Sequence, residues 1–504
     1  MWRCLFLLFV CWAMPVSAAT PVQKKTPNFI VILLDDLGLH DTGFMGNDFV
    51  ETPAIDQLAH DGIVFTRAYA NAPNCAPSRA AIMSGQYAPR TGVYTMMTGD
   101  MGDAAQRKLQ TPKNHMFLPE QVYTLAELLH DHGYATAQIG KWNLGHGAVR
   151  GPEGQGFDIN IGGHRGGVGS SYYAPYSKDL PGLQNAPAGE YLTDRLNNEA
   201  VQFINKNKDK PFFLYLSHYA PHFPIQAPRD TVKKYETKRD RFCGATPALK
   251  YCKMNMHYPE YAAMVEHIDR GVAQLRKTLQ ADGLADNTVI VLMSDNGGYA
   301  WVQDPQALSG QKSQLYEGGI RVPMVWLLPA NLADIKSPAG STVDVPVSGV
   351  DIYPTFAALA GIDVKKQTLD GVNISPLFSV AGKIPSRALY WYFPAYTLDN
   401  DVDDPEESVG SRVDQHFSQV PAAVILRDGW KLIRYYSSNE QSANNAQRND
   451  NAPELYYLPD DPLEKNNRFA SEKKRGSELM RELEQWLQST GGAVTLPANP
   501  AYHP

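Results

Sequence analysis

The sequence lacks a surplus of positive charge. Its 504 residues carry 46 Lys and Arg against 53 Asp and Glu, which gives a net charge of −7 at pH 7. A protein whose main partner is nucleic acid needs a positive surface to meet the phosphates, so the composition excludes that class. Any anion that this protein handles must be met locally, by a few placed cations.

Long hydrophobic runs are also missing, apart from one at the N-terminus. The segment "MWRCLFLLFVCWAMPVSAAT" has an early Arg, an apolar run and then Val16-Ser17-Ala18, the small-x-small pattern that signal peptidase reads. We therefore expect a cleaved signal peptide over residues 1–18 and an exported protein, periplasmic or secreted. An uncleaved anchor is the alternative, but the run is shorter than the roughly 20 residues of a spanning helix. We expect no stable membrane anchor.

Cysteine is scarce, with five in the whole chain. Removal of the signal peptide leaves Cys75, Cys243 and Cys252. The last two lie close together in "RFCGATPALKYCKM", and in an oxidising compartment we expect them to form a local disulfide. Cys75 is then left over, and an odd cysteine in an exported protein needs an explanation. A buried, inert thiol is the simplest one.

Four short apolar segments predict buried strands, and each runs directly into polar residues: "NFIVILLDDLG", "YATAQIGKWNLG", "KPFFLYLSHYAPH" and "NTVIVLMSDNGG". Helical patterns lie between them. In "TLAELLHDHG", for example, Thr124 is the expected N-cap, Glu127 completes a capping box and Gly133 ends the helix. Strands that alternate with helices predict the α/β class, with a large, mostly parallel sheet flanked by helices.

The polar residues that follow these strands predict a site. They are Asp35 and Asp36, Lys141, His218 and His222, and Asp295 and Asn296. Parallel sheets of this class bind ligands beyond the carboxyl ends of their strands, so we expect these side chains to converge on one rim. The carboxylate and amide oxygens among them suit Ca²⁺ or Mg²⁺ rather than Zn²⁺, and oxygen ligands alone do not separate the two ions.

The pattern changes after about Gly371. "SRALYWYFPAY", "AAVILRDGWKLIRYY" and "PELYYLPDDP" are typical of short antiparallel strands, and "KKRGSELMRELEQWLQST" predicts a closing amphipathic helix. We therefore expect a catalytic domain over residues 24–371 and a smaller C-terminal α+β domain over residues 372–504. The acidic segment "DNDVDDPEES" is interpreted as a solvated loop rather than a metal site.

Taken together, the motifs resemble the formylglycine-dependent type I sulfatases of the alkaline phosphatase superfamily, over nearly the whole chain. "CAPSRA" fits the family signature C-x-P-S-R and is followed by the usual "SGQYAPRTG". The further blocks follow in the family's order: "LLDDLG", "GKWNLG", "PHFP", "SDNGG", "KSQLYEGGIRVP" and "ELYYLPDDPLEKN". The resemblance implies an alkaline-phosphatase-like fold and a sulfuric ester hydrolase.

The resemblance also implies a role for Cys75. In this family a formylglycine-generating enzyme oxidises the motif cysteine to formylglycine during export, so Cys75 would be the precursor of an aldehyde. Hydrated, this aldehyde is a geminal diol. One of its oxygens attacks sulfur and displaces the alcohol, and the other then loses its proton and expels sulfate. A serine would lack the second hydroxyl.

A metal site is implied by the same resemblance. Asp35, Asp36, Asp295 and Asn296 resemble the family's calcium ligands, with Mg²⁺ as the alternative ion, and formylglycine at position 75 would contribute a further oxygen. Asp295 is also a candidate for deprotonating the attacking hydroxyl.

Substrate contacts are implied as well. Arg79 would hold the diol, Lys141 and Lys312 resemble the lysines that bind sulfate oxygens, and His222 resembles the histidine near the leaving oxygen. For Lys312 an ordinary surface lysine is the alternative. For His218, packing and the substrate pocket are equally open.

One position departs from the family pattern. The usual G-K-W-H-L-G has Asn143 in place of its histidine, and an amide can hydrogen-bond to the diol or to sulfate but cannot carry a proton. Either His222 does the proton work, or His146 or His164 fills the space. The glycine-rich "IGGHRGGVGSSYY" offers His164 and Arg165 to the substrate rim, or is a flexible loop.

The expected function is hydrolysis of a sulfate ester, and export favours a sulfated carbohydrate of algal galactan or glycosaminoglycan type. A broad arylsulfatase and a phosphonate or phosphodiester hydrolase of the same superfamily are the enzymatic alternatives. A silent carbohydrate-binding relative is the alternative from another class. Asn143 favours it, whereas the intact Cys75, Lys141, His222 and Lys312 argue against it.

Overall fold

The computed structural model describes residues 26–96, 100–176, 180–245, 258–299, 308–330, 332, 339–398, 417–437 and 453–503. The signal-peptide segment 1–18, the acidic segment 399–408 and Cys252 lie outside these ranges, and the predictions for them stay predictions. Cys243 is disulfide-bonded, and Cys75 is the free cysteine of the described residues. Within the same ranges, no helix combines the length and the apolar character needed to cross a membrane.

The four predicted strands form the centre of one sheet. They are β1 (Asn28–Leu34), β4 (Ala135–Gly140), β6 (Phe212–Ser217) and β7 (Thr288–Ser294). In the sheet they stand in the order β4-β6-β1-β7, and all neighbours among them are parallel. The predicted α/β class with a mostly parallel sheet is therefore confirmed.

Four shorter strands extend this sheet at both sides. They are β5 (Ile159–Ile161), β8 (Met324–Leu327), β2 (Ile63–Phe65) and β9 (Ser341–Val343), and the full order is β5-β4-β6-β1-β7-β8-β2-β9. β8 is antiparallel to both β7 and β2. A separate pair is formed by β3 (Ala68–Tyr69) and β10 (Val347–Ser348).

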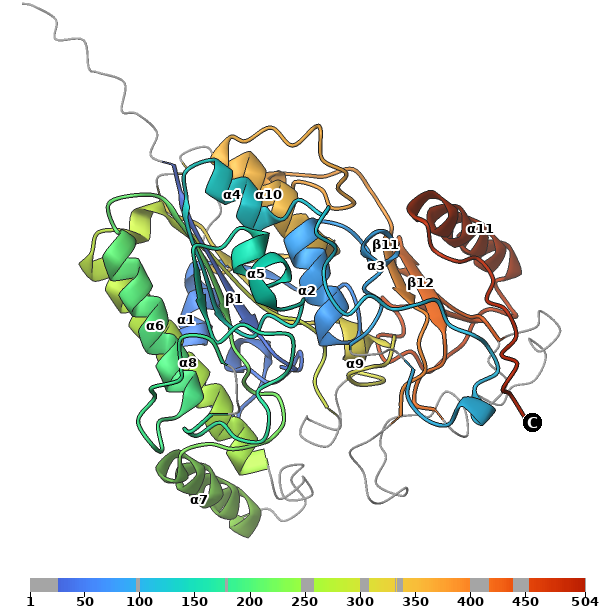
Figure 1. The fold of residues 1–504 in the computed structure, drawn as a ribbon. Helices are drawn as coiled ribbons and strands as arrows, with labels where there is room; N and C mark the ends of the chain where they lie inside the picture. The colour runs from blue at the N-terminus through green and yellow to red at the C-terminus, as the bar shows by residue number, and fades with distance from the viewer. Residues whose placement is uncertain are drawn as a thin grey trace, which may run out of the picture.

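Helices cover both faces of the sheet (Figure 1). One face carries α1 (Pro53–Asp61), α6 (Leu192–Asn207) and α8 (Tyr258–Ala281), and the other carries α2 (Cys75–Ser84), α4 (Leu125–Asp131) and α10 (Ile352–Ala360). Successive side chains of β1 point to opposite faces: Ile30 and Ile32 pack in the core with α6 and α8, and Val31 in the core with α2 and α10. This two-sided burial explains the continuous apolar runs.

Further helices lie outside these two layers. They are α3 (Ala88–Thr91), α5 (Gly147–Arg150), α7 (Arg229–Ala245) and α9 (Glu317–Ile320). The capping box expected at the start of α4 is present, since Thr124 accepts from the Glu127 backbone and Glu127 accepts from the Thr124 backbone.

The C-terminal part forms a second, antiparallel sheet beside the first (Figure 1). Its strands β11 (Leu389–Phe393), β12 (Ala422–Arg427), β13 (Trp430–Tyr435) and β14 (Glu454–Tyr457) pair in sequence order. The closing helix α11 (Lys473–Thr490) packs on it through Leu479 and Leu483, as its amphipathic pattern predicts. The smaller C-terminal α+β region is thus confirmed, while the domain boundary near residue 371 stays a prediction.

Candidate active site

The carboxyl ends of the four central strands meet at one edge of the sheet. In the parallel register Leu34 of β1 pairs with Ser294 of β7, and Gly140 of β4 pairs with Ser217 of β6. Gly140 adopts φ 103°, and a Cβ there would lie 1.9 Å from the Ser217 carbonyl oxygen, so only glycine fits. The residues that follow these strands are therefore brought together, although they are distant in sequence.

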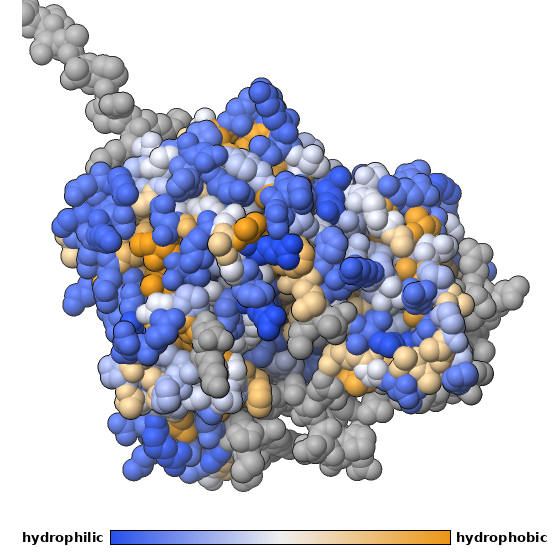
Figure 2. Space-filling model, in the orientation of Figure 1, coloured by the Kyte–Doolittle hydropathy of each residue, from blue (hydrophilic) through white to orange (hydrophobic). Residues whose placement is uncertain are grey.

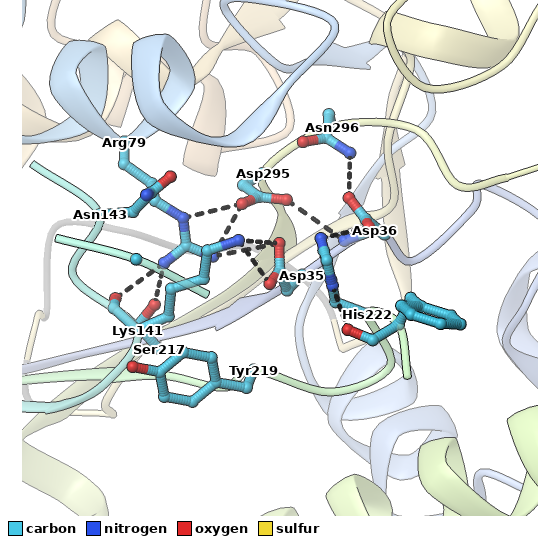
Figure 3. Close-up of polar contacts among 12 residues, drawn as sticks. Asp35, Asp36, Arg79, Lys141, Asn143, Ser217, Tyr219, His222, Asp295 and Asn296 are labelled. Carbon is cyan, nitrogen blue, oxygen red and sulfur yellow. Dashed lines mark hydrogen bonds and ion pairs between the residues drawn. The ribbon is translucent and has the colours of Figure 1, made fainter. Parts of the chain in front are cut away.

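Asp35 and Lys141 form a buried ion pair at this edge (Figure 3). The Lys141 Nζ lies 2.9 Å and 2.7 Å from the two carboxylate oxygens of Asp35. Burial alone would raise the pKa of Asp35, but Lys141 and the other nearby cations lower it well below its usual range. Asp35 is therefore a carboxylate at neutral pH.

Asp36 is held from three directions. Its Oδ1 accepts a hydrogen bond from Asn296 Nδ2 at 2.7 Å, its Oδ2 accepts one from Lys312 Nζ at 2.7 Å, and His222 Nε2 lies 3.5 Å from the same Oδ2. Asp36 adopts φ 66°, a left-handed conformation that is strained for a residue with a side chain. This turn directs two consecutive carboxylates into one cluster.

Lys312 is buried rather than a surface lysine. Burial lowers its pKa, but Asp36 and the other groups around it together raise it by more, so that the pKa of Lys312 lies well above its usual range. Its Nζ also lies 4.7 Å from the ring centroid of Tyr299. The alternative, that Lys312 is an ordinary surface lysine, is therefore wrong.

Arg79 ties the ends of several strands together from α2. Its Nε donates to Asp295 Oδ2 at 2.8 Å, and its Nη1 donates to the Lys141 carbonyl at 2.9 Å and to Ser217 Oγ (Figure 3). The whole side chain is buried. Because these partners lie at the ends of β7, β4 and β6, the guanidinium fixes the relative positions of the strand ends.

Cys75 is the first residue of α2 and is buried. Its Sγ and ligand atoms of Asp35, Asp36 and His222 all lie within 4.8 Å of one another. Burial raises the pKa of the thiol to about 12, with Lys141 and Lys312 opposing the shift. The thiol is therefore protonated at neutral pH, and a protonated thiol is neither a good nucleophile nor a good metal ligand.

A metal ion fits this cluster. The Asn296 Oδ1 is buried without a hydrogen-bond partner, while the amide nitrogen of the same side chain is bound to Asp36. With the carboxylates of Asp35 and Asp36 it forms a set of hard oxygen donors, which Ca²⁺ and Mg²⁺ prefer. Asp295 stands slightly apart, since its Oδ2 is engaged by Arg79 and its Oδ1 accepts from the Asp36 backbone at 3.3 Å.

The two histidines of the "SHYAPHFP" segment differ in their surroundings. The Nδ1 of His222 lies 2.6 Å from the Phe223 carbonyl oxygen, which can only accept, so Nδ1 carries hydrogen and Nε2 is free to exchange a proton near Asp36. Burial lowers the pKa of His218 to about 4, and the carboxyl that opposes this shift is Asp194 on α6. His218 is buried, and the choice between packing and the substrate pocket stays a prediction.

Asn143 holds a loop. It adopts φ 61°, its backbone N–H donates to the His164 carbonyl at 2.9 Å, and its Nδ2 donates to the Arg165 carbonyl at 2.9 Å. The two histidines considered as replacements, His146 and His164, both line a neighbouring hollow of about 800 Å³. Asn143, which stands where the family pattern has histidine, thus holds the glycine-rich loop in place.

Two residues of the site were not predicted. Ser217 accepts from Arg79, and its place as the last residue of a predicted strand was the signal that could have found it. The Tyr299 ring lies 6.4 Å from that of His222 and directly follows "SDNGG". Both lie at strand ends or immediately after a motif.

Buried carboxylates and cations thus meet at the carboxyl edge of a mostly parallel sheet, and comparison with known proteins identifies the family that has this arrangement. The family model described as Sulfatase matches residues 27–362, and the chain belongs to the sulfatase family, within the type I enzymes of the alkaline phosphatase superfamily. It is thus a sulfuric ester hydrolase.

Several characterised relatives cover most of the chain. Human arylsulfatase A is 30% identical over 417 residues, covering 75% of this chain and 73% of its own. A sulfatase from Formosa agariphila is 29% identical over 473 residues, covering 80% and 82%. Among solved structures, Ps i-CgsB has a TM-score of 0.70 with 30% identity and covers 94% of this chain and 95% of its own. The same protein is also known in complex with k-i-k-neocarrahexaose, a structure with 28% identity.

Proposed function

We propose that this sulfatase hydrolyses sulfate esters of a sulfated carbohydrate, of algal galactan or glycosaminoglycan type, using formylglycine at position 75 and a bound Ca²⁺, with Mg²⁺ as the alternative. The observation that carries the proposal is the burial of Cys75 among Asp35, Asp36 and His222. Burial raises the pKa of this thiol to about 12, so at neutral pH it is not a thiolate and cannot act as a nucleophile or metal ligand in that form. Conversion to an aldehyde by a formylglycine-generating enzyme during export gives the position a reactive group.

Formylglycine at position 75 would supply a hydrated aldehyde, with one hydroxyl to accept the sulfuryl group and a second to allow the release of sulfate. Arg79 is the cation best placed to fix this group, since it lies one helical turn after residue 75 and is itself held by Asp295. The side chain of residue 75 is buried, which excludes bulk water from the reacting atoms.

The metal would be held by Asp35, Asp36, Asp295 and Asn296. A divalent cation there would draw electron density from a sulfate oxygen and stabilise the charge that develops in the transition state. The unpartnered Asn296 Oδ1 supports this assignment, because a buried carbonyl oxygen without a partner costs free energy unless a cation or donor meets it.

Sulfate would be met by the lysines. The cations of the cluster are Arg79, Lys141 and Lys312, and its carboxylates are those of Asp35, Asp36 and Asp295. The three positive and three negative charges cancel, so a bound dication would give the cluster a net charge of about plus two. This charge would attract and stabilise one sulfate ester. Lys141 and Lys312, whose ammonium groups lie beside the carboxylates that would bind the metal, are placed to bind sulfate oxygens.

With its ring protonated at both nitrogens, His222 would donate the Nε2 proton to the leaving oxygen. Its Nδ1–H is held by the Phe223 carbonyl, which orients Nε2 toward the cluster (Figure 3). Asn143 would not take part in proton transfer, since its amide is used to hold the glycine-rich loop. A carbohydrate substrate is supported by the proposed export and by the likeness to Ps i-CgsB, whose structure contains k-i-k-neocarrahexaose.

The experiment is a comparison of the wild type with Cys75→Ser, after production with a formylglycine-generating enzyme. The wild type should release sulfate over many turnovers from defined sulfated oligosaccharides. The serine variant should keep the fold and accept the sulfuryl group at most once, because it lacks the second hydroxyl. Sustained turnover by the serine variant would refute the formylglycine mechanism, and release of sulfate from nitrophenyl sulfate but from no carbohydrate would favour an arylsulfatase instead.

A further inference from the structure

A hollow of about 800 Å³ lies beside the site and has no role in the chemistry described above. One wall is α5 with the residues that follow it, and the other is the glycine-rich loop over residues 163–169. Its polar lining includes His146, Glu153, Asn160, His164 and Arg165. The volume falls within the roughly 300–1,000 Å³ that small-molecule sites occupy.

The hollow is joined to the catalytic groups through short contacts. Asn143, two residues after Lys141, binds the carbonyls of His164 and Arg165. On the other side Tyr219, two residues after Ser217, donates its hydroxyl to the Gly162 carbonyl at 2.8 Å, and its ring lies 6.5 Å from the His164 ring. Both Asn143 and Tyr219 lie at the border of the cluster in Figure 3. The loop that lines the hollow is therefore held by residues that lie two positions from Lys141 and Ser217 in the chain.

The chemistry of the hollow favours a polar, anionic ligand. Arg165 is exposed and lines the hollow. Glu153, by contrast, is engaged by Asn160 Nδ2 at 3.2 Å. The His164 Nδ1 accepts a hydrogen bond from the Gly166 backbone at 2.9 Å. The surface that carries α5 is mostly hydrophilic, with hydrophobic side chains in small separate patches (Figure 2).

Glycines give the loop wall its shape. A Cβ at Gly163 would lie 2.2 Å from Gln138 Oε1, so a larger residue here would displace this side chain of β4. Gly167 is different, because nothing lies within 4 Å of the place its Cβ would take. Glycine at this position leaves the hollow open and exposes backbone that can hydrogen-bond to a ligand.

We propose that this hollow is a subsite for the sugar unit next to the one that carries the scissile sulfate, and that Arg165 binds an anionic group of that unit, a sulfate or a carboxylate. The inference rests on the proposed carbohydrate substrate and adds to it. The preferred substrate then has at least two sugar units, with a second anionic group on the neighbour.

The experiment compares kcat/KM on four probes: nitrophenyl sulfate, a disaccharide with only the scissile sulfate, and the same disaccharide with a further sulfate or a carboxylate on its second unit. The variants are Arg165→Gln, which removes the cation, and Gly167→Asp, which adds a carboxylate to the wall at an unhindered position. Arg481→Gln on the outer helix α11 removes the same charge from an exposed position and is the control.

Arg165→Gln and Gly167→Asp should each lower kcat/KM on the doubly anionic disaccharides by roughly ten- to a hundredfold, mainly through KM, because a hydrogen bond to a charged group is lost or opposed. Their kcat/KM on the other two probes should stay within about twofold of the wild type, as should every value for Arg481→Gln. Which of the two doubly anionic probes responds identifies the group as sulfate or carboxylate. Equal losses on all probes, or none on the doubly anionic ones, would overturn the subsite while leaving the proposed function intact. Failure to cleave any disaccharide would overturn both.

Discussion

Replacement of His222 should damage the hydrolysis of sugar sulfates far more than that of activated aryl sulfates. The Phe223 carbonyl fixes hydrogen on Nδ1, so Nε2 is the nitrogen that can deliver a proton to the leaving oxygen. A sugar alkoxide is a strong base and needs that proton, whereas nitrophenolate leaves without it. General acid catalysis contributes about 10²- to 10⁴-fold, equivalent to roughly 3–5 kcal/mol of transition-state stabilisation.

The assay measures kcat for His222→Ala and His222→Gln on a sulfated oligosaccharide and on nitrophenyl sulfate, under the same salt and calcium. Losses of at least about 10²-fold on the sugar and of less than about tenfold on the aryl ester are expected. Asn143→Ala is the control, because its amide holds a loop and carries no proton. It should show much less selectivity between the two substrates. Equal losses on both substrates in the His222 variants would refute the assignment of the proton donor.

Four other perturbations have defined outcomes. Chelation should remove activity and Ca²⁺ or Mg²⁺ should restore it, while Asp295→Ala should resemble permanent chelation. Lys431→Met should lower the free energy of unfolding by about 3–5 kcal/mol, because Lys431 is buried within 3.0 Å of Glu317 and 2.7 Å of Glu464 and both carboxylates would lose their cation. The pKa of His218 is about 4 in the folded protein against 6.5 normally, so the unfolded chain binds its proton first as pH falls. The wild type should therefore lose roughly 2 kcal/mol of its free energy of unfolding between pH 6.5 and 5 because of His218, and His218→Leu should not show this loss.

Each of these has a contradicting result. Restoration of the chelated enzyme by zinc alone would exclude the hard-cation site. In urea unfolding, a Lys431→Met loss no larger than that of the exposed control Lys474→Met would mean that the buried ion cluster does not stabilise the fold. An unchanged pH dependence of unfolding in His218→Leu would show that this histidine titrates normally.

The longer strands were predictable from the sequence because each is a continuous apolar run buried on both faces. β1, β4, β6 and β7 have six or seven residues each, and the polar residues after them mark the site. β2, β5, β8 and β9 have three or four residues each, too few to show a periodic pattern of apolar residues. These four strands, including the antiparallel β8, were therefore not predicted.

The residue types of the site were also predictable, but their pairing was not. Which cation meets which carboxylate depends on how α2, with Arg79, and the segment before α9, with Lys312, pack on the strand ends, and the sequence carries no local signal of this. Asn143 illustrates the limit: the sequence indicates a lost proton carrier, whereas its contacts to the carbonyls of His164 and Arg165 depend on tertiary structure.

The central claim is that residue 75 acts as formylglycine, and mass spectrometry of the peptide that contains it is the most direct measurement. The protein should be produced with a formylglycine-generating enzyme, shown to release sulfate over many turnovers, and then alkylated and digested. The peptide should have the lower mass of an aldehyde in place of the thiol, should resist thiol alkylation, and should increase in abundance in proportion to specific activity. An active preparation in which the peptide is fully alkylated at an intact Cys75 would contradict the account.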